Sequence, residues 1–193
     1  MRVKYQAMSR NIAIFGRFCA GKTTLATELA DSYGYVPVSM AANMKWIVKQ
    51  VYGTIDKSEQ VNVITQDGDV REITIRQALQ GVGERMKEID RDFWLKWFLS
   101  DCEAIPPDYP LVMDDARMLF EADVLRERGW LLVRLTVPEG VRAERHLKLY
   151  GRYPTDIEKN HPTETQVDGI TPDIDLDGTR PAEELADILV AYS

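Results

Sequence analysis

The sequence predicts an α/β fold with a mostly parallel sheet. Short apolar runs alternate with segments of helical periodicity along most of the 193 residues, a pattern typical of parallel sheets. A glycine-rich turn at 16–23 joins the first apolar run to the first helical segment. One departure from the alternation is Asp67-Gly68, which separates two β-prone runs and predicts an inserted β-hairpin.

In the first half of the chain we expect two sheet strands, the hairpin and four helices. Residues 11–15 are apolar and are expected to form a buried strand. Apolar residues then recur at helical spacing up to Tyr33, and Gly34 ends that helix. The other expected elements are a strand at 35–38, a helix at 40–52 ended by Gly53, hairpin strands within 61–75, and helices at about 75–87 and 92–103.

The second half continues the alternation. Residues 111–113 are apolar and lead into Asp114 and Asp115, as in a buried strand that ends in carboxylates. Pro138 suits the first turn of a helix, where its missing N–H is not needed. Residues 151–172 are polar and contain proline, so we expect a loop or lid there. The remaining expected elements are helices at 121–128, 138–150 and 182–191 and strands at 130–137 and 173–177.

Composition indicates a single globular domain, 1–193, that carries a small insertion. Hydrophobic residues make up 45% of the chain, and no apolar run approaches the roughly 20 residues that cross a bilayer. The net charge of -7 argues against a broad nucleic-acid-binding face. Two cysteines, Cys19 and Cys102, are too few for a disulfide scaffold, so we expect a reducing, cytoplasmic location.

The glycine-rich turn matches a phosphate-binding loop, Gly-x4-Gly-Lys-Thr. Gly16 and Gly21 allow the backbone to approach a polyphosphate, Lys22 would reach the β- and γ-phosphates, and the Thr23 hydroxyl would bind Mg²⁺. A chance match is the alternative, but the strand before the motif and the helix after it are the context that such a loop requires. The expected ATP contacts are Gly16, Arg17, Phe18, Cys19, Ala20, Gly21, Lys22, Thr23 and Thr24.

Asp114 and Asp115 are the candidate carboxylates at a strand end. Neighbouring strand residues point to opposite faces, so one of the two is expected to face the nucleotide. Asp114 is the candidate for the metal and Asp115 for the acceptor side, and which of the two faces the nucleotide stays open; a helix N-cap is the alternative role. Arg117 follows and could reach an acceptor phosphate, unless it is an exposed surface arginine.

Two arginine-bearing helices could clamp phosphates. Arg76 and Gln80 are four residues apart and share a helix face, and we expect Arg85 close to that face. Arg142 and Arg145 lie on the helix after Pro138. Arg145, Lys148 and Arg152 would form one basic stripe if that helix extends far enough. Solvated helix faces are the alternative for both groups.

The histidines and the aromatic cluster are expected to be structural. His146 and His161 have no partner at metal-ligand spacing, so neither is expected to be catalytic. Phe93, Trp94, Trp97 and Phe98 recur at helical spacing, which favours core packing over base stacking. We retain Trp94 as a candidate wall of the acceptor pocket.

These pieces, in this order, resemble the deoxynucleoside monophosphate kinases of large tailed bacteriophages, within the P-loop nucleoside monophosphate kinase group. The resemblance covers most of the chain. It rests on the phosphate loop and on the following sets: Ser39, Ala41 and Lys45; Arg76, Leu79, Gln80, Gly83 and Arg85; Asp92 and Trp94; Asp114, Asp115, Ala116, Arg117 and Glu121; and His161, Pro162, Thr163 and Glu164.

The resemblance implies a three-layer α/β/α P-loop kinase fold, with an acceptor-binding region at 39–91 and a lid at 138–165. It implies an acceptor site with Lys45, Arg76, Gln80, Arg85 and Arg117, and lid arginines Arg142 and Arg145. Lys22, Arg117, Arg142 and Arg145 are thus the candidate catalytic residues. The hairpin near 61–75 has no counterpart that we can match, and it could enlarge the acceptor pocket or mediate self-association as a homodimer.

The predicted activity is transfer of the ATP γ-phosphoryl group, with Mg²⁺, to a deoxynucleoside monophosphate. Three alternatives remain open: a P-loop kinase that acts on a modified base in DNA, a kinase like dephospho-coenzyme A kinase, and a nucleotide-binding module without catalysis. The acidic balance counts against the first and the arginines at 76–85 against the last. If the chain is phage-encoded, the expected location is the host cytoplasm.

Overall fold

The computed structural model describes residues 10–192, which fall into two compact units. The first unit combines the chain up to Ser39 with the chain from Ile105 onwards, and the second is the continuous segment Met40–Ala104. None of the helices within 10–192 is long and apolar enough to cross a membrane.

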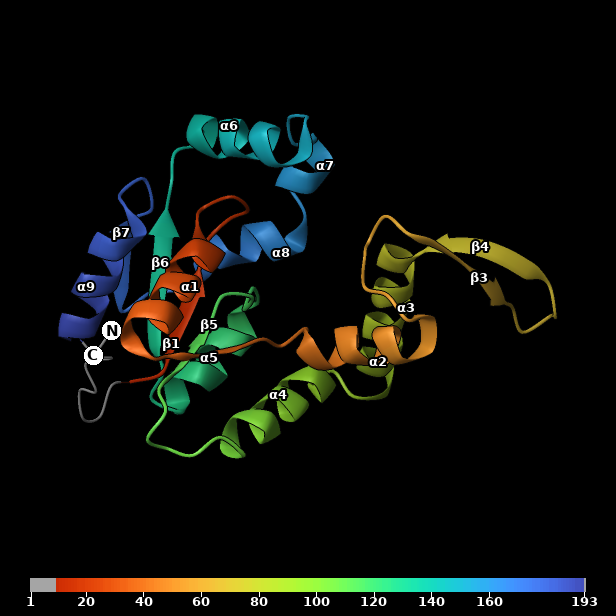
Figure 1. The fold of residues 1–193 in the computed structure, drawn as a ribbon, viewed down its shortest axis with the longest axis horizontal. Coiled ribbons are helices and arrows are strands. Elements are labelled where there is room, and N and C mark those ends of the chain that lie inside the picture. Colours follow the sequence, from red (N-terminus) through yellow and green to blue (C-terminus); the bar gives the residue numbers. More distant parts are fainter. Residues whose placement is uncertain (1–9, 193) are drawn as a thin grey trace. The chain divides into compact units, whose positions relative to one another are not determined.

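A five-stranded parallel sheet organises the first unit (Figure 1). Its strand order is β2-β5-β1-β6-β7, with every neighbouring pair parallel. The strands are β1 (Ile12–Phe15), β2 (Val36–Val38), β5 (Leu111–Met113), β6 (Leu131–Thr136) and β7 (Ile174–Asp177). β1 and β5 are buried along their full length, as expected for strands that are covered on both faces.

Helices cover both faces of this sheet, which makes the three predicted layers. α1 (Lys22–Tyr33) and α9 (Ala182–Tyr192) pack together, and their apolar residues join Ile12 and Ile14 in one core cluster. On the other face lie α5 (Leu119–Glu127) and the short 3₁₀ helix η1 (Gln166–Gly169). The predicted three-layer α/β/α fold with a mostly parallel sheet is therefore confirmed.

The segment after β6 contains more helix than the sequence predicts. α6 (Glu139–Tyr150) ends at Gly151, and the predicted loop at 151–172 instead holds α7 (Asp156–Lys159), α8 (Pro162–Thr165) and η1. Helices of four residues are too short to show a periodic apolar face, so the pattern missed them. Thr155 with Glu158 and His161 with Pro162 supply their N-terminal caps.

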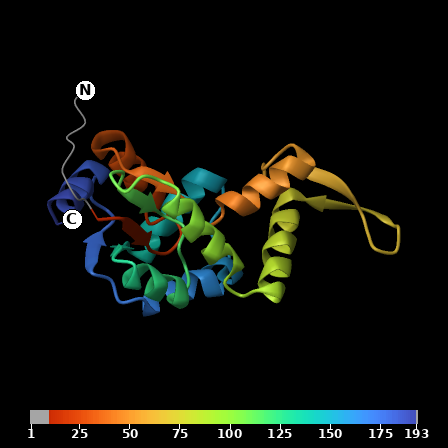
Figure 2. The ribbon, with the colours of Figure 1, turned by 90° about the horizontal axis from the view of Figure 1, so that it is seen from below.

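The second unit contains the predicted hairpin and three helices. β3 (Gln60–Ile64) and β4 (Val70–Thr74) pair antiparallel, and the hairpin projects from the ends of the helices (Figures 1 and 2). Thr74 ends β4 and also caps α3 (Ile75–Ile89) in a capping box with Gln77. The other helices are α2 (Ala42–Tyr52) and α4 (Phe93–Glu103).

Candidate active site

The phosphate loop has the backbone conformation that its glycines predict. Gly16 has φ 147°, and a Cβ there would lie 2.7 Å from the carbonyl oxygen of Leu135. Gly21 has φ 98° and stands directly before Lys22, the first residue of α1. Cys19 is the only non-glycine residue with positive φ within 10–192. The loop therefore opens at the positive end of α1, where a phosphate is stabilised.

Lys22 is buried, and its side chain folds back onto the phosphate loop. Its ammonium donates to the carbonyl oxygens of Gly16 at 2.7 Å and Arg17 at 3.0 Å, and only 8% of the residue is exposed. Burial, followed by the positive charge of Arg117, lowers the pKa of Lys22 to about 8. The hydrogen-bond partners of the Lys22 ammonium are neutral carbonyl groups, so a bound phosphate would bring a negative charge that stabilises the charged lysine.

The adjacent carboxylates of Asp114 and Asp115 accept hydrogen bonds from different hydroxyl groups. Asp114 accepts a hydrogen bond from Thr23 Oγ1 at 2.5 Å, and Asp115 accepts one from Ser39 Oγ at 2.6 Å. Asp114 thus meets the phosphate loop, whereas Asp115 meets Ser39, just after β2. A hydroxyl and a carboxylate side by side are oxygen donors of the kind that fits Mg²⁺.

Arg117 is held by two glutamates. Its backbone N–H donates to Glu121 at 2.7 Å, and its guanidinium forms an ion pair with Glu164. The other Glu164 oxygen accepts the backbone N–H of Phe18, in the phosphate loop, at 2.6 Å. Glu164 is only 6% exposed, whereas the Arg117 side chain is 36% exposed.

Arg145 contacts the phosphate loop through backbone carbonyl groups. Its guanidinium donates to Cys19 at 3.2 Å, to Ala20 at 3.3 Å and to Gly178 at 2.9 Å. The expected basic stripe does not continue from it, because α6 ends at Tyr150 and Arg152 lies beyond that end, paired with Glu158.

Arg142 points into the interior. It is 6% exposed, donates to the Val137 carbonyl at 3.1 Å, and lies 5.0 Å from the centre of the Phe18 ring. Its Nη1 atom is buried without a hydrogen-bond partner. Burial, followed by the nearby charge of Arg17, lowers the pKa of Arg142.

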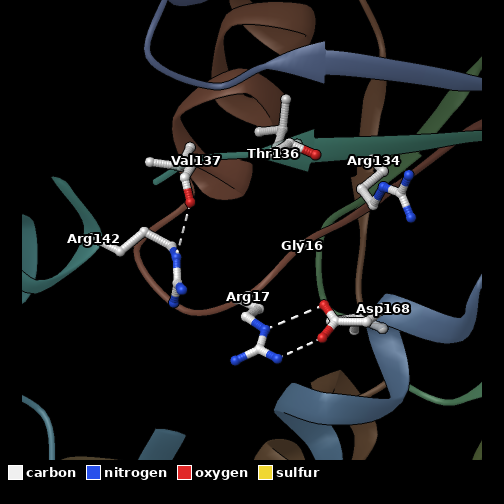
Figure 3. Close-up of a pocket in the computed structure, with 9 residues that line it drawn as sticks. Gly16, Arg17, Arg134, Thr136, Val137, Arg142 and Asp168 are labelled. Carbon is white, nitrogen blue, oxygen red and sulfur yellow. Dashed lines mark hydrogen bonds and ion pairs between the residues drawn. The ribbon is translucent and has the colours of Figure 1, made fainter. Parts of the chain in front are cut away.

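A cavity of about 180 Å³ lies beside the start of the phosphate loop (Figure 3). It is lined by Gly16 and Arg17, by Thr136 at the end of β6 and the following Val137, and by Arg142 and Asp168. Arg17 forms an ion pair with Asp168 across this space, while Arg142 turns to Val137 (Figure 3). The hydrogen bond to Asp168 raises the pKa of Arg17 and lowers that of Asp168.

The predicted acceptor residues of the second unit lie on its three helices. Arg76 and Gln80 are exposed on α3, and Lys45 is half-buried on α2. The expectation for Arg85 is wrong, because nine residues are two and a half helical turns and place it opposite Arg76. Arg85 instead pairs with Glu88, at 2.7 Å on the surface. Trp94 is buried, and its indole N–H donates to the Gly83 carbonyl at 3.1 Å.

The structure gives structural contacts to both histidines and adds two acidic residues to the site. His146 Nδ1 lies 2.8 Å from the Arg152 carbonyl, and His161 accepts the Thr163 N–H in the cap of α8. Glu164 and Asp168, which carried no predicted role, both contact the phosphate loop. For Glu164 the available signal was its place in the motif at 161–164, whereas nothing in the sequence singles out Asp168.

No family model matches the sequence. A curated protein of Acanthamoeba polyphaga mimivirus, described as "Putative deoxynucleotide monophosphate kinase", is 27% identical over 168 residues. The match covers 76% of this chain and 80% of the viral protein. It confirms the resemblance to deoxynucleotide monophosphate kinases that the sequence motifs indicate.

Solved structures show the same fold. Shikimate kinase from Aquifex aeolicus superimposes with a TM-score of 0.57 at 18% identity, over 94% of each chain. A gluconokinase from Sinorhizobium meliloti gives a TM-score of 0.51 at 20% identity, over 96% of this chain and 92% of the other. The chain thus has the P-loop kinase fold and resembles the deoxynucleotide monophosphate kinases in sequence, and both findings are consistent with an ATP-dependent phosphotransferase.

Proposed function

We propose that this protein is a deoxynucleoside monophosphate kinase, which transfers the γ-phosphoryl group of ATP to a dNMP and releases dNDP and ADP. The observation that carries the proposal is the buried Lys22 at the mouth of a phosphate loop, with Arg117 close enough to lower its pKa. The viral relative supports a nucleotide as acceptor.

The donor side of the reaction is assigned to the first unit. Lys22 and the loop N–H groups bind the β- and γ-phosphates, and Thr23 with Asp114 holds Mg²⁺. When bound, Mg²⁺ neutralises charge on the phosphate oxygens. Arg145, which contacts the loop, and Arg142, which lines the cavity beside it, are assigned to the γ-phosphate, where they would stabilise the charge of the transition state.

The residues proposed for the acceptor are Arg117 and Asp115 in the first unit and Lys45, Arg76, Gln80 and Trp94 in the second. The acceptor is already an anion, so the site needs cations and alignment more than a general base. Arg76 and Gln80 share a face of α3, which suits contact with one phosphate or base. Lys45 completes the proposed set, and Trp94 supports α3 through Gly83.

An ADP-release assay with MgATP tests this proposal. Each deoxynucleoside and ribonucleoside monophosphate is offered in turn, with duplex and single-stranded DNA and dephospho-coenzyme A in separate arms. We expect turnover with one or a few dNMPs. Lys22→Met should lower kcat about 10²–10³-fold, because it removes a charge that stabilises the transition state.

Lys148→Met is the matched control, since Lys148 is exposed on α6. It makes the same substitution away from the loop and should leave kcat unchanged. Turnover with DNA alone would contradict the proposal and favour a DNA kinase, and ATP binding without any acceptor would favour a binding module.

A further inference from the structure

Glu164 is a buried carboxylate for which the proposed reaction gives no direct use. A phosphate site normally excludes negative side chains, because they repel the ligand. Yet Glu164 lies at the phosphate loop, with one oxygen on the Phe18 N–H at 2.6 Å and the other on the Arg117 guanidinium. Both oxygens are therefore occupied by donors of the protein.

The charges around Glu164 explain why a carboxylate is tolerated there. Arg117 and Lys22 repel one another, as the effect of Arg117 on the pKa of Lys22 indicates. Without a counter-charge, a side chain like Arg117 would turn outwards into solvent. Glu164 holds it beside Lys22 and leaves 36% of the Arg117 side chain exposed for a ligand. The trio of Lys22, Arg117 and Glu164 keeps a net positive charge.

α8, which carries Glu164, is held in place by buried residues that follow it in the chain. Val167 and Ile170, just after α8, are 1% and 3% exposed. The Leu119 side chain lies against Gly169, since a Cβ added to this glycine would be 3.3 Å from Leu119 Cδ2. Asp168, one turn beyond Glu164, binds Arg17 of the same loop. A side chain on such a support has a fixed position, which is what alignment of a charged group requires.

A second glutamate provides an internal comparison. Glu158 and Glu164 each occupy the third position of a four-residue helix, and each pairs with an arginine. Glu158 turns back to cap its own helix, through the N–H of Thr155 at 2.9 Å. In α8 the His161 side chain is the cap, so Glu164 is free to reach the phosphate loop.

We propose that Glu164 is a positioning residue, which holds the Arg117 guanidinium beside the phosphate loop so that Arg117 and Lys22 both act on the phosphoryl group that is transferred. The inference rests on the proposed kinase function and adds to it. Glu164 acts through Arg117 and does not itself touch substrate.

A double-mutant cycle tests this role. Glu164→Gln keeps the shape of the side chain but offers one acceptor oxygen in place of two. In the wild-type background it should lower kcat about 10–100-fold, as loss of a positioning partner does at other sites, with KM for MgATP changed less than about threefold. In an Arg117→Ala background the same change should lower kcat less than about twofold.

Glu158→Gln is the matched control and should leave kcat and KM unchanged. Thermal unfolding of every variant separates misfolding from mispositioning, and Glu164→Asp, which keeps the charge, replaces Glu164→Gln if that variant does not fold. An equal loss of kcat in both backgrounds would overturn the proposal. So would an unchanged kcat with tighter MgATP binding, which would mean that Glu164 blocks the loop.

The Kd of MgATP is measured for the same four proteins of the cycle. With this second readout the proposed kinase function and the positioning role of Glu164 can fail separately. If wild-type protein phosphorylates no monophosphate, the proposed function falls. Non-additive effects of the two substitutions on MgATP binding would still support Glu164 as the residue that positions Arg117, and additive effects would overturn it.

Discussion

At the scale of single residues, Lys22 shows how the protein prepares for an anion. It is the buried cation of the phosphate loop, and its charge is compensated by two carbonyl oxygens instead of a carboxylate. Because burial and Arg117 lower its pKa to about 8, the free protein begins to lose this charge just above neutral pH. A bound polyphosphate would raise the pKa of Lys22 again and restore the charge.

This gives the binding of MgATP a defined pH dependence. ATP prefers the protonated lysine, so affinity should be full at a pH well below the pKa of Lys22 in the free protein and should fall as pH rises through that pKa. We expect about tenfold weaker binding at pH 9 than at pH 7, with proton uptake on binding in that range. Titration calorimetry in buffers of different ionisation enthalpy measures both quantities.

Lys22→Arg is the control for this effect, because a guanidinium does not lose its proton in this range. Its MgATP affinity, whatever its absolute value, should be flat between pH 7 and pH 9. A wild-type affinity that is equally flat would show that Lys22 stays charged in the free protein.

At the scale of elements, two glycines with opposite roles can be compared. A Cβ on Gly16 would meet the Leu135 carbonyl at 2.7 Å, and φ there is 147°. A Cβ on Gly81, within α3, would meet nothing within 4 Å. Gly16→Ala should therefore weaken MgATP binding more than about tenfold, whereas Gly81→Ala should stabilise the protein by about 0.5–1 kcal/mol.

Nucleotide titrations and thermal unfolding of the two variants check this contrast. Unimpaired nucleotide binding by Gly16→Ala would mean that β6 can withdraw from the loop, and a lower Tm for Gly81→Ala would mean that position 81 needs glycine for another reason.

Elements with a strong periodic signal were predictable, and those fixed by single contacts were not. The apolar run at 11–15, the loop glycines and the Asp67-Gly68 turn each determine their own backbone, and the structure places β1, α1 and the hairpin accordingly. α7 and α8 depend on caps at Thr155 and His161, and helices this short have no apolar periodicity from which they could be predicted.

At the scale of the whole molecule, the chain divides its proposed ligands between two units. The phosphate loop belongs to the first, and α3 with Arg76 and Gln80 belongs to the second, Met40–Ala104. Amide hydrogen exchange should show this division. MgADP should slow exchange at 16–24, and the preferred dNMP should slow exchange in α3, because bound ligands protect the amides that they order.

The hairpin strands β3 and β4 are the internal reference for this experiment and should exchange at the same rate with either ligand. Protection by dNMP at 16–24 alone would move the acceptor out of the second unit.

The candidate site was predictable to the extent that it is local in sequence. Lys22 and Thr23 follow from a motif of eight consecutive residues, and the carboxylates at 114 and 115 follow from the end of an apolar strand. Glu164 meets Phe18 across 146 positions of sequence, and such a contact depends on how α8 is supported. Pairwise contacts of this length leave no periodic trace in one sequence.

The central position of β1 in the sheet also affects how the chain folds during its synthesis. Its four residues are fully buried between β5 and β6, and Ile12 pairs with Val112 on one side and Leu131 on the other. At roughly 5–20 residues per second, a ribosome delivers the second of these partners about ten seconds after the strand itself. During synthesis this apolar strand thus waits unpaired while the whole Met40–Ala104 unit emerges, and nascent chains should depend on chaperones over that interval.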